Sequence, residues 1–286
     1  MPREILFTLP HTQLSARQWE SNATDALPVF ALHGWLDNAA SFDEIAPQLE
    51  NVSITALDLA GHGLSDHRPD GGFYHLWDYV LDLVSILQLQ KQSVWLIGHS
   101  MGGAVAMLVA ALAIDKVRGL VLLDNVGPLI DEAENRVSTM QRAVKKMLQY
   151  KKRNKSGYSS IETMIRARMN GFTKLDHAAA TKLVMRGSVP QQDLWGWRHD
   201  EKLMFPSPFR MDEASVSAFI EKITCPTLLL VAKEGIYQQH PDVVDMRAKC
   251  FSWVKLKWLE GGHHFHLEQN TSVAVANEIK CFMDSN

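Results

Sequence analysis

The sequence predicts an α/β fold with a mostly parallel central sheet, and three observations support this prediction. Short apolar runs rich in β-branched residues recur without alternating polar residues, as expected of strands that are covered on both faces. Helical patterns separate several of these runs. A segment of different composition interrupts the alternation between residues 128 and 212. We therefore expect a sheet with helices on both faces and an inserted helical cap.

The expected strands and helices follow from local periodicity. An amphipathic helix is indicated by the apolar stripe of Tyr79, Val80, Leu83, Val84 and Leu87. Residues 104–113 are apolar on all sides, which predicts a helix buried against the sheet. The apolar runs predict strands at 29–32, 54–57, 94–97, 120–123, 227–231 and 253–256.

The segment 128–212 differs in charge and in pattern. It contains 16 Lys and Arg against 9 Asp and Glu, although the whole chain has a net charge of −3. It has hardly any strand-like runs, and helical spacing recurs at 137–148, 164–169 and 178–184. We therefore expect a core formed by residues 1–127 and 213–286 and a cap at 128–212. The run from Arg142 to Lys155 has seven basic residues and no acid, and predicts either a solvated helix face or an anion-attracting rim.

Bulk composition excludes several classes of protein. With 286 residues, of which 46% are hydrophobic and 21% charged, the chain is typical of a soluble globular protein. The N-terminus MPREILFTLP does not resemble a secretory signal, and no apolar run is long enough to span a membrane. Three scattered cysteines indicate buried thiols in a reducing compartment, so we expect a cytoplasmic protein. Gly61-His62-Gly63 lacks the continuation of a dinucleotide motif, and we expect no cofactor and no nucleic-acid partner.

The stretch Gly98-His99-Ser100-Met101-Gly102 has the pattern of a nucleophile elbow, G-x-S-x-G, between an expected strand and an expected helix. Such a turn forces the serine into a strained backbone conformation, and the glycines remove side chains that would clash. The hydroxyl would then project above the sheet, near the positive end of the following helix. Ser100 is therefore the expected nucleophile.

A serine nucleophile needs a general base, and the stretch Gly261-Gly262-His263-His264-Phe265-His266 after the last expected strand supplies three candidates. A metal-binding cluster is the alternative interpretation of three close histidines, but no accompanying Cys or Asp pattern supports it. We expect no metal.

The developing oxyanion needs two backbone N–H donors. Met101, directly after the nucleophile, is expected to supply one. The second is expected from Trp35, because His33-Gly34-Trp35 follows an expected strand and Gly34 lets the main chain come close to the substrate oxygen.

Four motifs in this order resemble the α/β-hydrolase superfamily over nearly the whole chain: HGW at 33–35, DLAGHGLSD at 58–66, GHSMGG at 98–103 and GGHHFH at 261–266. The stretches 122–128 (LLDNVGP) and 197–231 further resemble the serine hydrolase-like proteins, a subgroup of uncertain substrate. The resemblance implies a lid of helices over the site. It also implies that His263, the first histidine after the double glycine, is the base, with His264 as the second choice.

The sequence departs from the resemblance at the acid of the triad. Many relatives have an aspartate after the strand expected at 227–231, where this chain has Gly235. Asp124, at the end of the strand expected at 120–123, is the preferred acid, and Glu234 is the alternative. The chain order of nucleophile, acid and histidine is compatible with both residues.

These residues predict a serine-dependent acyl hydrolase that acts on an apolar, small-molecule ester or related acyl compound. Carbon–carbon bond hydrolysis, thioester hydrolysis and perhydrolysis remain open within the serine enzymes. A binding protein on a hydrolase scaffold with little turnover is the alternative from a different class, because of the glycine at position 235.

Overall fold

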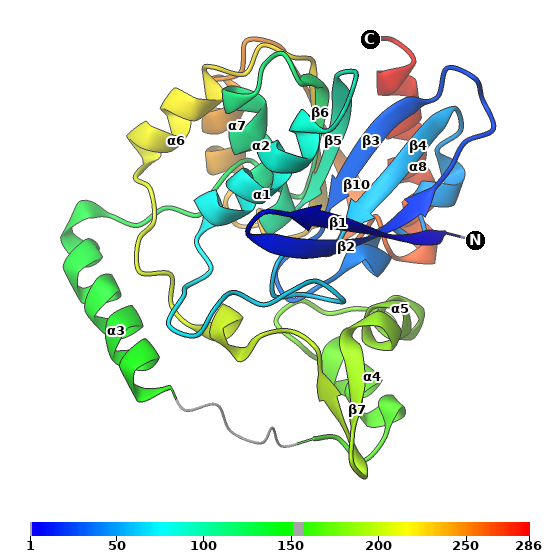
Figure 1. Ribbon diagram of the computed structural model, residues 1–286. Helices are drawn as coiled ribbons and strands as arrows, with labels where there is room; N and C mark the ends of the chain where they lie inside the picture. The colour runs from blue at the N-terminus through cyan, green and yellow to red at the C-terminus, as the bar shows by residue number, and fades with distance from the viewer. Residues whose placement is uncertain (1, 151–156) are drawn as a thin grey trace.

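A single eight-stranded sheet forms the centre of the molecule (Figure 1). The computed structural model describes residues 2–150 and 157–286. The strands lie in the order β1-β2-β4-β3-β5-β6-β9-β10, and every neighbouring pair from β4 to β10 is parallel. Their bounds are β1 Arg3–Leu9, β2 Thr12–Trp19, β3 Leu27–Leu32, β4 Val52–Leu57, β5 Val94–His99, β6 Val117–Leu123, β9 Thr227–Glu234 and β10 Val254–Gly262. All six strands expected from the sequence are present, and the predicted α/β fold class is confirmed.

The antiparallel pair β1–β2 at one edge of the sheet was not expected from the sequence. In β1, exposed and partly buried residues alternate, because one face of this edge strand lies in solvent. Such a strand lacks the long uninterrupted apolar run that predicts a strand buried on both faces. Strand β2 pairs antiparallel with β4 and joins this edge to the parallel strands.

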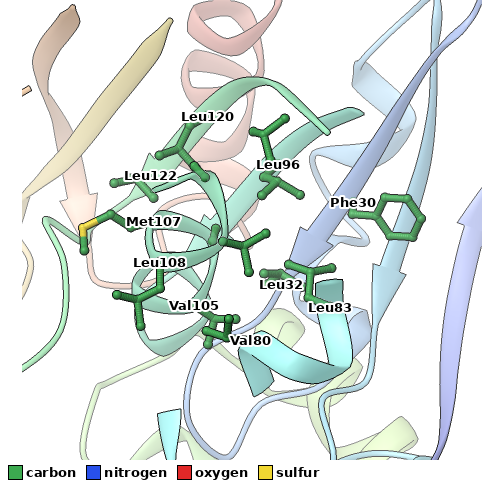
Figure 2. Close-up of a cluster of buried hydrophobic side chains, with 14 of the residues drawn as sticks. Phe30, Leu32, Val80, Leu83, Leu96, Val105, Met107, Leu108, Leu120 and Leu122 are labelled. Atoms are coloured by element: carbon green, nitrogen blue, oxygen red, sulfur yellow. The ribbon is translucent and has the colours of Figure 1, made fainter. Parts of the chain in front are cut away.

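Helices cover both faces of the sheet. They are α1 Leu76–Gln88, α2 Met101–Leu112, α6 Glu213–Ile220, α7 Pro241–Ala248 and α8 Gln269–Met283. Figure 2 shows one of the two resulting core layers, in which Val105, Met107 and Leu108 of α2 and Leu83 of α1 pack on strand residues such as Leu96. On the opposite face, α8 packs against the sheet through Val275, Ile279 and Phe282. The central strands are thus buried on both sides, which explains their uninterrupted apolar sequences.

The segment between β6 and α6 is mainly helical. It contains α3 Arg136–Gln149, α4 Ile161–Met169 and α5 His177–Gly187. Ser160 and Asp176 accept hydrogen bonds from backbone N–H groups in the first turns of α4 and α5, which explains where these helices begin. The two ends of the segment lie together, because Asp131 N–H donates to the carbonyl of Met211. An antiparallel hairpin, β7 Ser188–Gln191 with β8 Leu194–Trp197, was not expected from the sequence.

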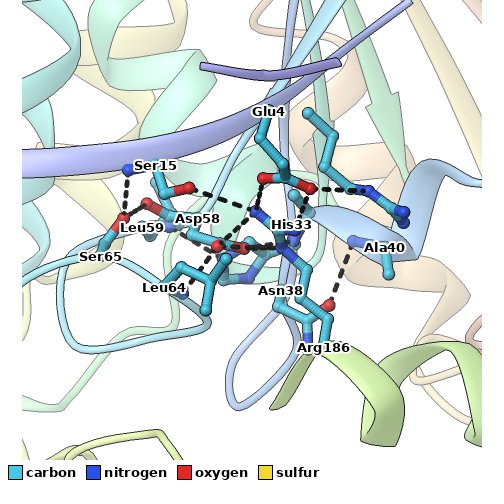
Figure 3. A network of polar contacts seen from close by, with 12 residues as sticks. Glu4, Ser15, His33, Asn38, Ala40, Asp58, Leu59, Leu64, Ser65 and Arg186 are labelled. Atoms are coloured by element: carbon cyan, nitrogen blue, oxygen red, sulfur yellow. Dashed lines mark hydrogen bonds and ion pairs between the residues drawn. The ribbon is translucent and has the colours of Figure 1, made fainter. Parts of the chain in front are cut away.

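A buried polar network joins α5 to the core (Figure 3). The carboxylate of Asp58 accepts from the backbone N–H groups of Ala39 and Leu64, at 2.7 and 2.8 Å, and pairs with Arg186 of α5 at 2.8 Å. Asp58 is fully buried, so its charge is compensated by these donors rather than by water. The stretch DLAGHGLSD therefore has a structural role: its aspartate fixes two loops and one helix.

The expectation that all three cysteines are buried is wrong. Cys225 is buried, but Cys250 is partly exposed and Cys281 is exposed. Cys281 lies on α8 outside the set of residues that this helix buries, so its thiol faces solvent. Among the described residues, no helix combines the length and the apolar character that crossing a membrane requires.

Candidate active site

The expected site residues lie at the carboxyl ends of neighbouring strands. The loop with Trp35 follows β3, Ser100 follows β5, Asp124 follows β6 and His263 follows β10. Because these strands are parallel, their carboxyl ends share one edge of the sheet. The strand order also reverses between β3 and β5, where ligands bind in open parallel sheets.

Ser100 occupies a strained turn between β5 and α2. Its φ of 49° and ψ of −120° lie in a region that residues other than glycine rarely adopt. The approach of strand and helix is so close that a Cβ on Gly98 would lie 2.5 Å from Gly103 Cα, and one on Gly102 would lie 2.2 Å from the carbonyl oxygen of Leu32. The two glycines therefore allow the turn, and Ser100 lies at the positive end of α2.

The structure brings His263 and Asp124 together. The Nδ1 atom of His263 lies 2.5 Å from Oδ2 of Asp124, and Asp124 is fully buried. The imidazole of His263 also lies beside that of His99, with ring centroids 4.6 Å apart, and His99 directly precedes Ser100. Among the described residues, no hydrogen bond joins the Ser100 hydroxyl to His263. Bonds of this kind are often long without substrate and tighten when it binds.

The surroundings of Asp124 explain the glycine at position 235. Asp124 accepts hydrogen bonds from the N–H groups of Ala232 and Ile236, both at 3.1 Å, so its carboxylate lies against the end of β9. A Cβ on Gly235 would lie 2.3 Å from Oδ2 of Asp124. The carboxylate from β6 thus occupies the space where a side chain at position 235 would begin. Glu234, in contrast, is exposed.

Two buried imidazoles hold the loop that contains Trp35. His33 Nε2 accepts from the N–H of Leu59 while its Nδ1 donates to the carbonyl of Gly34, and His62 Nε2 accepts from the N–H of Leu36. Burial lowers the pKa of His33 to about 4 and that of His62 to about 3, so both rings are neutral and can accept. The indole of Trp35 donates to the carbonyl of Leu203. Met101 is the first residue of α2, so its N–H is among those without a partner inside the helix.

The site also contains a polar cluster that sequence reasoning missed. Asp37, His99, His264 and Arg168 of α4 form it, and Asp37 is at its centre. One oxygen of Asp37 accepts from Arg168 at 2.7 Å, and the other accepts from Nε2 of His264 at 2.9 Å. Burial alone would raise the pKa of Asp37, but His264 and Arg168 hold it well below its usual range.

This cluster links three loops of the site. Asp37 follows Trp35 by two residues, His99 precedes Ser100, and His264 follows His263. Nε2 of His99 also donates to the carbonyl of His263, at 2.9 Å. His264, the second choice as base, is thus directed at Asp37 and away from Asp124, and burial lowers its pKa. The residues of the cluster lie up to 227 positions apart in the chain, and no local pattern indicates their contact.

A metal ion fits this cluster poorly. Asp37, His99 and His264 each offer a ligand atom, all within 4.8 Å of one another. The guanidinium of Arg168 already donates to Asp37, however, and lies 3.3 Å from Nε2 of His264. A cation placed between these atoms would be repelled by the adjacent positive charge. His266, the third histidine of the C-terminal run, pairs instead with the hydroxyl of Ser41.

We expect Arg168→Ala to lower the free energy of unfolding by about 3 kcal/mol, because it leaves the buried carboxylate of Asp37 without its cationic partner. Urea unfolding followed by circular dichroism measures this. Arg166→Ala is the matched control on the same helix: Arg166 pairs with Glu162 in solvent, and its loss should cost less than about 0.5 kcal/mol. Equal effects of the two substitutions would contradict a specific role of the Arg168–Asp37 pair.

Comparisons with known proteins identify the family and the fold. The sequence profile of the alpha/beta hydrolase fold matches residues 28–206. A serine hydrolase-like protein from Danio rerio is 30% identical over 98% of this chain and 88% of its own length. The solved structure of a hypothetical protein from Pseudomonas aeruginosa PAO1 is 36% identical, with a TM-score of 0.92 and coverage of 98% of this chain and 99% of that one. The thioesterase domain from the curacin biosynthetic pathway shares the fold, at 20% identity, a TM-score of 0.83 and coverage of 98% and 99%.

Proposed function

We propose, from the premise that this chain belongs to the α/β-hydrolase fold family and to its serine hydrolase-like subgroup, that it is a serine-dependent acyl hydrolase. Ser100 would attack the ester or related acyl bond of a small-molecule substrate. The observation that carries the proposal is the hydrogen bond from His263 to Asp124, beside a serine in a strained turn.

In the proposed reaction, the Ser100 hydroxyl attacks the acyl carbon while Nε2 of His263 removes its proton. Asp124 accepts the Nδ1–H of His263, fixes the tautomer of the ring and stabilises the imidazolium. The N–H groups of Trp35 and Met101 would stabilise the oxyanion. His263 then protonates the leaving group, and a water molecule activated by the same imidazole hydrolyses the acyl-enzyme.

The alternative of a binding protein rested on the glycine at position 235. The carboxylate of Asp124 lies against Gly235 and leaves no space for a second acidic side chain there. The glycine is therefore no argument for a site without an acid. Thioester cleavage requires the same groups as ester cleavage, and the likeness to the curacin thioesterase domain extends to the fold alone. Acyl hydrolysis is therefore proposed without a choice between oxygen and sulfur esters.

We further propose that residues 128–212 act as a lid over an apolar pocket. Three apolar side chains from segments next to the site stay substantially exposed: Trp35 at 41%, Leu129 at 65% and Met204 at 58%. The indole of Trp35 binds the carbonyl of Leu203, so the lid contacts the loop that would supply an oxyanion donor. Exposed apolar side chains around a site favour an apolar acyl group.

We expect the purified protein to be labelled by a fluorophosphonate probe and to hydrolyse p-nitrophenyl esters, with short or medium acyl chains preferred over long ones. The lid limits the room for a long chain, and the probe reacts only with an activated serine. Mass spectrometry of the labelled protein should locate the adduct on Ser100. A protein that is not labelled by the probe and hydrolyses none of the esters would contradict the proposed function.

A further inference from the structure

Helix α3 packs on the rest of the protein through a narrow side. Thr139 and Ala143 are its buried residues. Arg136 pairs with Asp212 at 2.6 Å, and the ammonium of Lys146 lies 5.7 Å from the centre of the Phe205 ring. These contacts fix which side of α3 faces the protein.

The other side of α3 exposes an apolar stripe. Val137, Met140, Val144 and Leu148 lie on one side of the helix because their spacing follows the helical turn, and they are 69, 46, 43 and 81% exposed. A shallow groove of about 510 Å³ runs along the stripe, and its lining residues within the described part of the chain belong to α3. In Figure 1, α3 stands at the periphery of the molecule, away from the sheet. Large apolar side chains gathered in solvent mark an interaction surface.

The charge on α3 is positive throughout. The helix has four basic residues (Arg136, Arg142, Lys145 and Lys146) and no acid, in a chain whose net charge is −3. Lys145 borders the groove, whereas the guanidinium of Arg142 donates to the hydroxyl of Thr139 on the side of α3 that faces the protein. The nearest acids in sequence, at 131–134, precede the opposite end of the helix. The end of the expected basic run, at 151–155, lies outside the described residues.

We propose that α3 docks on an anionic lipid surface. Val144 and Leu148 would enter the boundary between headgroups and acyl chains, while Lys145 contacts the anionic headgroups and the other basic residues of α3 add long-range attraction. An apolar stripe on a helix with basic residues and no acid is the pattern by which amphipathic helices bind in the plane of a membrane. The surface is an addition to the proposed activity and does not depend on Ser100.

A second copy of this chain fits the stripe less well. Of the described residues, seven line the groove, all from one helix, whereas a stable dimer interface needs about 20 to 30 residues on each side. In a symmetric dimer through this face, the basic residues of two α3 helices would also meet, and their like charges would repel. An anionic lipid surface complements the same charges.

A series of contacts connects α3 to the candidate active site. Tyr150, directly after α3, packs against Phe205 with ring centroids 5.3 Å apart. Phe205 follows Leu203, whose carbonyl accepts from the indole of Trp35. These contacts connect α3 to the loop beside Ser100.

Sedimentation with vesicles tests the proposal. The full chain should bind vesicles of equimolar phosphatidylcholine and phosphatidylglycerol, bind pure phosphatidylcholine vesicles at least about tenfold more weakly, and dissociate at 0.5 M NaCl. Val144→Ser with Leu148→Ser should weaken binding about tenfold or more. Lys145→Glu should weaken it by about fivefold or more.

Leu81→Ser with Leu112→Ser is the matched control, because both side chains are exposed, at 57 and 61%, on helices other than α3. It should change binding less than twofold, and thermal melting should verify that all variants fold. Equal binding to both kinds of vesicle, or α3 variants that bind like the control, would overturn the proposal. So would a dimer in gel filtration that the Val144 and Leu148 substitutions abolish, since a second copy would then cover the stripe.

Discussion

Ser100→Ala is expected to lower kcat for p-nitrophenyl esters by on the order of 10⁶-fold, because the substitution removes the proposed nucleophile. The remaining groups of the site would then support only the direct attack of water on the ester. The fluorophosphonate adduct should disappear with the turnover. The same change should hardly affect folding. The Ser100 hydroxyl has no hydrogen bond to another described side chain, and alanine keeps a Cβ at the strained φ of 49°. The melting temperature should therefore stay within about 2 °C of the unsubstituted protein.

Ser41→Ala is the matched control for the loss of a serine hydroxyl near the histidines. Ser41 is fully buried, and its hydroxyl pairs with Nε2 of His266. Its loss should lower the free energy of unfolding by about 1 kcal/mol and leave most of the turnover. Ser100→Ala should thus abolish turnover and preserve stability, whereas Ser41→Ala should lower stability and preserve turnover. Turnover that survives in Ser100→Ala would exclude Ser100 as the nucleophile.

The parts of the fold that could be predicted are those in which local sequence and tertiary burial agree. The strand at 94–97 and the helix from Met101 are apolar throughout because sheet and helix bury them on all sides. The edge strand β1 and the hairpin β7–β8 have partly exposed residues, and their patterns are weak for that reason. Nucleophile and histidine lie in motifs whose spacing is local, so the sequence alone identified Ser100 and His263 as candidates.

Contacts between distant segments could not be predicted in the same way. Arg168 reaches Asp37 across 131 positions, and neither residue lies in a motif that indicates the pair. The glycine at position 235 is the most instructive case. In the sequence, this glycine indicates a missing acid. In the structure, it leaves room for the carboxylate of Asp124, which comes from the end of another strand. That the acid stands at position 124 in place of position 235 becomes apparent only in the structure, where β6 and β9 pair side by side.

Asp124→Asn is expected to lower kcat by about 10⁴-fold, or about 5 kcal/mol of transition-state stabilisation, because an amide neither fixes the correct tautomer of His263 nor stabilises the imidazolium. The fold should survive with a loss of about 1 to 3 kcal/mol, since Asn has one acceptor oxygen in place of two and can keep only one of the two N–H hydrogen bonds that Asp124 accepts. Steady-state kinetics with a p-nitrophenyl ester and urea unfolding measure the two effects separately.

Glu234→Gln provides the control, and a relocated acid provides the rescue. Glu234 is exposed at the end of β9, so its neutralisation should change kcat less than about threefold. A Cβ on Gly235 would lie 2.3 Å from Oδ2 of Asp124. The double variant Asp124→Gly with Gly235→Asp would therefore place a carboxylate in the same region, attached after β9 instead of after β6. It should recover at least about tenfold of the turnover that Asp124→Asn loses. A large loss in Glu234→Gln together with a mild one in Asp124→Asn would assign the acid to Glu234. Mild losses in both would mean that His263 works without an acid, and the hydrogen bond to Asp124 would then be structural.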